Sequence, residues 1–206
     1  MSQTFMRTLF TVFALSPFLL GSLASAQDSP PVRVRGTIDH LESEALIVKA
    51  RDGAELKITL APNAVVLATV KASLADIKPG TFVGVAAMPQ PDGSQRALEV
   101  HIFPEAMRGT GEGHFAWDLH PRSTMTNGRV EQPVATADGQ ILTLKYKHGE
   151  KRIIVPPDVP IVFYQPTDKS ELKAGARIFI AAAKKQADGT LQAPRIGVGR
   201  NAPPPM

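Results

Sequence analysis

The sequence predicts an all-β protein made of two small barrels in tandem, OB-like or SH3-like, behind a signal peptide that is removed. Three observations predict this fold class. Apolar residues alternate with polar ones over short stretches, turn dipeptides separate these stretches, and one order of strands and turns occurs twice. No apolar pattern with helical spacing persists for three turns, which argues against a helical protein.

The N-terminus has the three parts of a signal peptide. Arg7 is basic, Leu9–Leu20 is an apolar run of 12 residues, and the Ala-Ser-Ala at 24–26 supplies the small residues of a cleavage site. The apolar run is shorter than the roughly 20 residues that span a bilayer, which favours cleavage over a membrane anchor. We therefore expect residues 1–26 to be removed and the mature protein to be periplasmic or secreted, with no transmembrane span.

The composition narrows the function classes. There is no cysteine, so no disulfide holds the fold and packing must do so. The 23 Lys and Arg residues are interspersed with 19 Asp and Glu residues, which is typical of a solvated surface rather than a nucleic-acid patch. With one Trp and two Tyr the chain has few side chains on which bases could stack, so no nucleic-acid partner is predicted.

The repeat is the strongest pattern in the sequence. The stretch LIVKARDGAELKITLAPNAVVL at 46–67 parallels LTLKYKHGEKRIIVPPDVPIV at 142–162, and SLADIKPGTFVGV at 73–85 parallels KSELKAGARIFI at 169–180. Corresponding residues stay 95 or 96 positions apart. We therefore predict duplication of one structural unit.

Each unit is expected to hold five or six short strands and one helical turn. Dipeptides such as Asp52-Gly53 and Asp188-Gly189 accept the positive φ angles of tight hairpins. A closed barrel suits this content because closure removes sheet edges; a single β-sandwich using both halves is the alternative. The chain is predicted to have five parts: signal peptide 1–26, first barrel 27–106, interdomain segment 107–123, second barrel 124–201 and Pro-rich tail 202–206.

The segment between the units is where specialised chemistry is expected. Residues 101–125 hold three of the five histidines and the only Trp, and have no counterpart at the end of the second unit. The segment is one of three things: a connector whose Phe115 and Trp117 fill a groove between barrels, a metal site, or a loop that binds a ligand or partner around Trp117. The residues predicted to bind a ligand or partner are Arg108, His114, Phe115, Trp117 and Arg122.

The metal hypothesis depends on imidazole and thioether groups, which suit copper, with thioether favouring Cu(I). The candidate ligands are His101, Met107, His114, His120 and Met125. Their spacing matches no established metal signature. Ser123 lies near His120 and Asp118, but without the turn that surrounds a hydrolase nucleophile, so no catalytic residues are predicted.

Three stretches resemble a group of exported proteobacterial proteins built from small β-barrel repeats of a domain of unknown function. These are VHIFPEAMRGTGEGHFAWDLHPRSTMTN at 100–127, VPPDVPIV at 155–162 and DGTLQAPRIGVGR at 188–200. Some members of the group carry the description "metal ABC transporter permease". A permease needs several spans of about 20 apolar residues, and only the signal peptide approaches that pattern here. The resemblance implies a two-barrel fold and no particular activity.

Together these observations predict a periplasmic binding or accessory protein, not an enzyme, with an unidentified ligand or protein partner and no cofactor. The alternative is a periplasmic copper-type metal-binding protein that uses the histidines and methionines of the central segment. We also expect residues 27–106 and 124–206 each to keep β structure when expressed apart.

Overall fold

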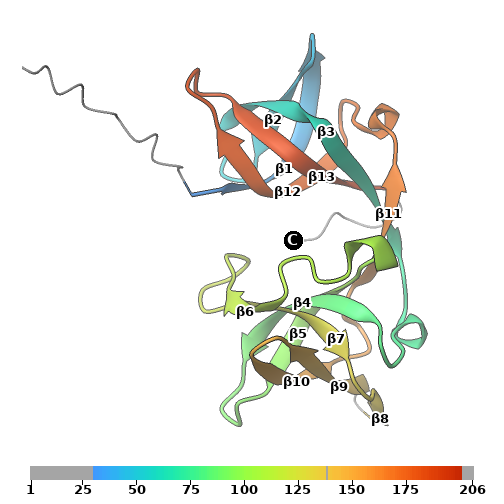
Figure 1. The fold of residues 1–206 in the computed structure, drawn as a ribbon. Coiled ribbons are helices and arrows are strands. Elements are labelled where there is room, and N and C mark those ends of the chain that lie inside the picture. Colours follow the sequence, from blue (N-terminus) through green and yellow to red (C-terminus); the bar gives the residue numbers. More distant parts are fainter. Residues whose placement is uncertain (1–29, 138, 201–206) are drawn as a thin grey trace, which may run out of the picture.

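The protein is almost entirely β-structure, which confirms the predicted fold class. The computed structural model (Figure 1) describes residues 30–137 and 139–200; the predicted signal peptide and the tail 202–206 lie outside them. The described residues form a sheet of 13 strands and three single 3-10 turns. None of the described segments is a helix of the length and apolarity needed to cross a bilayer.

Five strands close the first barrel, which we call the terminal barrel because its strands come from both ends of the chain. They are β1 (Val32–Glu42), β2 (Ala45–Ala50), β3 (Glu55–Lys71), β12 (Arg177–Lys185) and β13 (Leu191–Gly199). The ring of pairings runs β1–β2–β3–β13–β12 and returns to β1. β13 is parallel to β3 and the other pairs are antiparallel, an OB-like closure.

Five strands from the middle of the chain close the second barrel, which we call the central barrel. They are β4 (Phe82–Pro89), β5 (Gln95–Ile102), β7 (Thr124–Val130), β9 (Gly139–Tyr146) and β10 (Gly149–Val155). The ring runs β7–β9–β10–β5–β4 and returns to β7, and its parallel pair is β5 with β10. Each barrel therefore has no open edge.

The remaining elements link or extend the barrels. The short strands are β6 (Gly113–Ala116), which pairs with β7, β8 (Val134–Thr136), which pairs with β9, and β11 (Ile161–Thr167). The 3-10 turns are η1 (Leu74–Asp76), η2 (Glu105–Met107) and η3 (Lys169–Glu171). η1 and η3 lie in the paired stretches 73–85 and 169–180, in agreement with the prediction of one helical turn in each unit.

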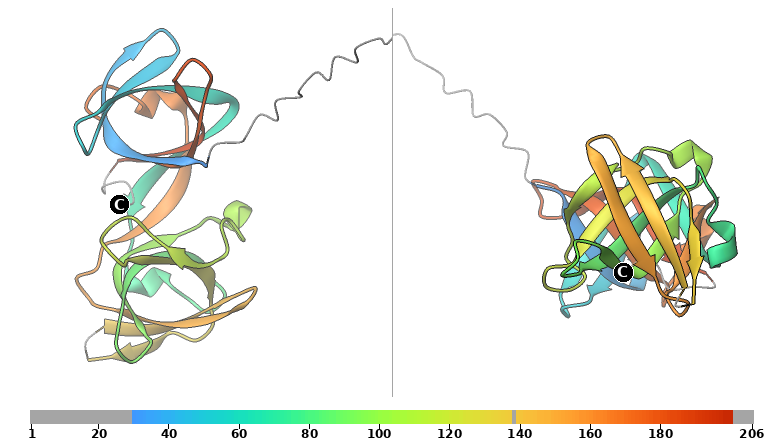
Figure 2. Two further views of the ribbon diagram at one scale, coloured as in Figure 1. Left: turned by 90° about the vertical axis from the view of Figure 1, so that its left-hand side faces the viewer. Right: turned by 90° about the horizontal axis from the view of Figure 1, so that it is seen from below.

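The structure differs from the predicted tandem order, because the chain does not divide between the barrels at residues 106 and 124. Segment 27–106 gives β1 to β3 to one barrel and β4 and β5 to the other, and segment 124–201 is shared in the same way. The physical reason is that β3 continues for 17 residues and leaves the terminal barrel instead of turning back. β11 returns beside it, antiparallel (Figures 1 and 2).

Equivalent strand pairs recur in the two barrels. In the terminal barrel Leu191 lies opposite Ile58, and in the central barrel Gln95 lies opposite Ile153; the residue numbers differ by 96 and 95. Where β3 and β11 pair, Thr69 lies opposite Tyr164, which is again 95 residues away. The two barrels are thus related by an approximate two-fold axis that passes near this pair.

Gly36 and Gly128 occupy equivalent places in β1 and β7 and allow the same close approach. A Cβ atom on Gly36 would lie 2.4 Å from the carbonyl oxygen of Lys49, and one on Gly128 would lie 2.7 Å from that of Lys145. Both distances are below van der Waals contact, so only glycine fits without a shift of backbone. Gly36 and Gly128 are therefore needed for closure of the barrels.

Each barrel has its own apolar core. Buried branched residues such as Ile38, Ile58 and Ile178 fill the terminal barrel. Another set that includes Leu142, Leu144 and Ile153 fills the central barrel. The space between the barrels is thus separate from either core, and the chain after β5 runs beside it.

Candidate ligand-binding cavity between the barrels

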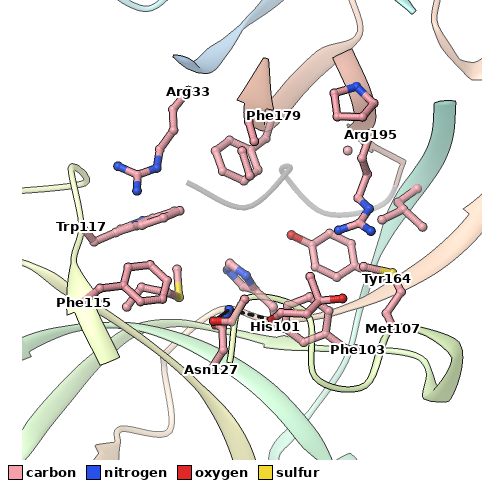
Figure 3. Close-up of a pocket in the computed structure, with 18 residues that line it drawn as sticks. Arg33, His101, Phe103, Met107, Phe115, Trp117, Asn127, Tyr164, Phe179 and Arg195 are labelled. Carbon is pink, nitrogen blue, oxygen red and sulfur yellow. Dashed lines mark hydrogen bonds between the residues drawn. The ribbon is translucent and has the colours of Figure 1, made fainter. Parts of the chain in front are cut away.

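A cavity of about 380 Å³ lies between the two barrels. Its walls come from strands of both barrels and from the segment 103–123 that follows β5, which we call the connector (Figure 3). This volume lies within the roughly 300–1,000 Å³ typical of small-molecule sites.

Aromatic side chains gather in the walls of the cavity. Five of the eight aromatic residues within 30–200 line this one cavity: Phe103, Phe115, Trp117, Tyr164 and Phe179. Neighbouring rings are in contact distance, with centroids 5.4 Å apart for Phe103 and Tyr164, 6.1 Å for Phe115 and Trp117, and 6.2 Å for Trp117 and Phe179. Most of the aromatic residues within 30–200 are therefore concentrated on one surface.

The terminal barrel contributes the roof of the cavity. Phe179 of β12 lies between Arg33 of β1 and Arg195 of β13, and all three point towards the central barrel (Figure 3). Phe179 faces outwards because Ile178 and Ile180 on either side of it fill the barrel core and side chains alternate along a strand.

The connector is fastened to the terminal barrel beside Trp117. The Arg33 guanidinium carbon lies 4.1 Å from the Trp117 ring centroid, a cation–π distance. Next to it, Asp118 accepts a hydrogen bond of 2.9 Å from Arg35 and lies 3.5 Å from Arg33. Partial burial raises the pKa of the Asp118 carboxyl, but the hydrogen bond from Arg35 and the two arginine charges outweigh it, so that pKa lies below its usual value.

The floor of the cavity holds a buried polar pair from β5. Val100 and Ile102 fill the central core, so Glu99 and His101 face the other way, towards the terminal barrel. The His101 Nε2 atom lies 3.1 Å from a Glu99 carboxylate oxygen, and each side chain is only 4% exposed. The atoms are close without the alignment of a hydrogen bond, so Nε2 has no hydrogen-bond partner.

Asn127 of β7 holds the connector from below. Its Nδ2 donates hydrogen bonds to the backbone carbonyl oxygens of Thr110, at 3.2 Å, and Gly111, at 3.1 Å. Its Oδ1 is buried without a partner and lies over Gly84 of β4, where a Cβ atom would come within 2.6 Å of it. A glycine at this position makes room for the Asn127 side chain.

Tyr164 presents a hydroxyl group to the cavity (Figure 3). Burial raises the pKa of this phenol far above its ordinary value, and the negative charge of Glu99 raises it further, while Arg195 acts in the opposite sense. The hydroxyl therefore keeps its proton and is a potential hydrogen-bond donor. The same interactions place Glu99, Tyr164 and Arg195 within electrostatic range of one another.

Two of the five residues predicted to bind a ligand or partner line the cavity: Phe115 and Trp117. The others do not. Arg108 forms a two-pronged pair with Glu105 at 2.6 Å, and Arg122 is exposed in a turn at φ 67°. His114 accompanies Phe115 on β6 but points to the opposite face, where it bonds Thr126 at 2.8 Å.

The five predicted metal ligands are only partly brought together. His101, Met107 and Met125 line the cavity, whereas His114 and His120 do not. Met107 lies beside Tyr164 (Figure 3), while Met125 is paired with Phe115 across β6 and β7. Within residues 30–137 and 139–200, no three His, Asp or Glu side chains cluster as a metal site requires.

The most informative residues that the sequence did not reveal come from the terminal barrel or the strand that returns to it. They are Arg33, Tyr164, Phe179 and Arg195, together with Asn127 on β7. One signal was available: Phe179 is a large aromatic residue on the solvent side of a predicted strand, which marks a covered surface.

The fold and the cavity define an all-β protein of two closed barrels with a small-molecule-sized cavity between them. No family model, no curated protein and no solved structure matches this chain.

Proposed function

We propose that the protein is an exported, non-enzymatic binding protein that takes up a small, largely apolar organic molecule between its barrels. The observation that carries this proposal is the convergence of five aromatic side chains, from the terminal barrel, the connector and β11, on one cavity of about 380 Å³. Flat apolar walls with a few polar groups are typical of small-molecule sites.

The two barrel cores do not account for these walls. Each barrel has its own buried core, and neither core includes the aromatic residues of the cavity. Two buried polar atoms that belong to cavity-lining residues, His101 Nε2 and Asn127 Oδ1, lack hydrogen-bond partners. An unpaired buried polar atom costs about 1–3 kcal/mol, and a ligand that bonds to it offsets that cost.

The hydrogen bonds of Ser123, the serine close to His120 and Asp118 in the sequence, favour binding over catalysis. The Ser123 hydroxyl lies 2.8 Å from the His120 carbonyl oxygen and 3.0 Å from that of Trp117, and it also accepts from the His120 amide. These backbone contacts close a turn. We assign Ser123 a structural role in the connector.

Export of the protein is part of the proposal. It is supported by the signal-peptide pattern of residues 1–26. Cell fractionation with N-terminal sequencing tests it: the mature protein is expected outside the cytoplasm and to begin at Gln27. A cytoplasmic protein that still carries residues 1–26 would contradict it.

A neutral fluorescent probe tests the binding function. N-phenyl-1-naphthylamine, which brightens in apolar surroundings, is expected to bind with a micromolar Kd and to change the emission of Trp117, the only tryptophan. Ala182 is exposed and lines the cavity, so Ala182→Phe fills the space without entering a barrel core. We expect this variant to bind at least tenfold more weakly.

The matched control places the same side chain elsewhere. Ala174 is exposed in the turn before β12 and does not line the cavity, so Ala174→Phe is expected to leave binding unchanged. Equal binding by wild type and Ala182→Phe, or no binding tighter than millimolar, would overturn the proposed function.

A further inference from the structure

The polar groups of the cavity are not evenly spread. Arg195 and the Tyr164 hydroxyl lie together at the end of the cavity beside Met107 (Figure 3). Phe115 and Trp117 form the opposite end, with Phe179 in the roof between the two. The cavity thus has one donor-rich end and one aromatic end, the division expected for a ligand with a polar head and an apolar body.

The arginines at the two ends differ in their partners. Arg33 and Arg35 share the carboxylate of Asp118. Arg195 makes no ion pair within 4.0 Å with any acidic side chain of the described residues. Its guanidinium points down beside the Tyr164 ring at this end of the cavity (Figure 3). The donor group at the polar end is therefore available to a ligand.

The charge around the cavity favours an anion. Three arginines, at 33, 35 and 195, face two carboxylates, those of Asp118 and Glu99, so the charged side chains leave a net positive charge. A guanidinium and a protonated phenol are both donors, and a carboxylate accepts from both. A cation bound among the aromatic rings would meet this positive charge, and Arg33 already covers one face of Trp117.

We propose that the cavity selects an amphipathic organic carboxylate, with its carboxylate at Arg195 and the Tyr164 hydroxyl and its apolar body against Phe179, Trp117 and Phe115. This inference rests on the proposed binding function and adds the chemical class of the ligand. Glu99 lies beside this end, 3.1 Å from His101 Nε2, and forms no ion pair within 4.0 Å with Arg195, so the ligand's carboxylate displaces no carboxylate of the described residues from Arg195.

Three isosteric probes separate the classes of ligand: 2-naphthoate, naphthalene-2-methanol and 2-naphthylmethylammonium. Calorimetric titration of each, with the indole N–H signal of Trp117 followed by NMR, gives the affinity and reports binding at the site. We expect naphthoate to bind at least tenfold more tightly than the alcohol and the ammonium to bind most weakly.

Variants locate the carboxylate. Arg195→Gln is expected to bring the naphthoate-to-alcohol ratio close to one, and Tyr164→Phe, which keeps the ring, to lower it a few-fold. Arg177→Gln is the matched control, since Arg177 is exposed on β12 and does not line the cavity; it should leave the ratio unchanged. Thermal unfolding checks that each variant is folded.

The outcomes distinguish this inference from the function on which it rests. Binding of the alcohol as tightly as naphthoate, tightest binding of the ammonium, or a ratio unaffected by Arg195→Gln would overturn the anionic ligand class while the binding function stands. Failure of all three probes to bind would remove both.

Discussion

The two faces of the cavity are built from equivalent strands that carry opposite chemistry. With the offsets of the strand pairs, Glu99 and His101 of β5 correspond to Arg195 and Gly197 of β13. Gly84 of β4 corresponds in the same way to Phe179 of β12. An acid thus stands where the other face has a base, and a glycine where the other has an aromatic ring.

This difference shows how an approximately symmetric frame yields an asymmetric site. Two identical faces would place like charges or two large rings against each other across the axis. Here the equivalent positions of the two faces differ in size, as Phe179 and Gly84 do, and a cavity lies between the faces instead of a packed interface. Duplication supplies the frame and divergence of the facing residues supplies the site.

The largest expected effect is loss of folding when the two copies of the repeated unit are produced as separate fragments. Fragments 30–106 and 107–200 each lack strands that close both barrels, so neither should fold as a monomer. Mixing them is expected to restore the circular dichroism of the whole chain and a 1:1 complex by size-exclusion chromatography.

The fragment test needs a concentration series, because two copies of one fragment could pair and close two barrels between them. The series separates such self-association from folding of a monomer. Self-association at high concentration is compatible with the topology. A folded monomer of either fragment at low concentration would show that a single copy closes its own barrel, as the tandem prediction required, and would contradict the shared barrels.

A smaller effect is expected from substitution of the equivalent glycines Gly36 and Gly128. Because the two barrels share one strand plan, the two substitutions should cost the same unfolding free energy. Gly36→Ala and Gly128→Ala each force a Cβ atom against a backbone carbonyl, and each should cost about 2 kcal/mol of unfolding free energy in urea titrations. Gly149→Ala is the control, because its nearest neighbour is the movable Tyr146 ring. A harmless change at one of the two positions would break the equivalence of β1 and β7.

Local features of the fold were predictable from sequence, and long-range ones were not. Asp-Gly turns appear where expected, with Gly53, Gly93 and Gly189 at positive φ, because the dipeptide itself sets the turn. The choice of partner strands was not predictable. The same turns and alternation serve a barrel closed within one copy or between two, and nothing local shows that β3 continues through Pro62 and Asn63.

The candidate site divides in the same way. The aromatic content of the connector indicated Phe115 and Trp117, which do line the cavity. Their partners on the opposite barrel, Phe179 and Arg195, lie more than 60 residues away in sequence, and no local pattern links them to the connector. The metal set failed to assemble fully because alternation along β6 turns His114 away from the face that Phe115 occupies.

The smallest expected effect concerns how each face holds the connector. Arg35 and Asn127 are equivalent positions of β1 and β7, and both bond it: Arg35 through Asp118, Asn127 through two backbone carbonyls. Only the first bond carries charge, so only it should depend on pH. Asp118→Asn is expected to cost roughly 0.5–1 kcal/mol at pH 7, as for other partly exposed ion pairs.

The sign of the pH dependence follows from the lowered pKa of Asp118 in the folded protein. Its stabilisation is complete above the unfolded-state pKa of about 3.9 and is lost as the pH falls through the lower folded-state pKa. The gap in unfolding free energy between wild type and Asp118→Asn, measured in urea, should therefore shrink on acidification, and salt should shrink it at pH 7. Asp158 lies in the exposed loop after β10, and Asp158→Asn is the control: its unfolding free energy should equal that of the wild type at every pH. A gap that stays constant from pH 7 to pH 3 would mean that the Asp118 charge contributes nothing and that both faces hold the connector by neutral contacts alone.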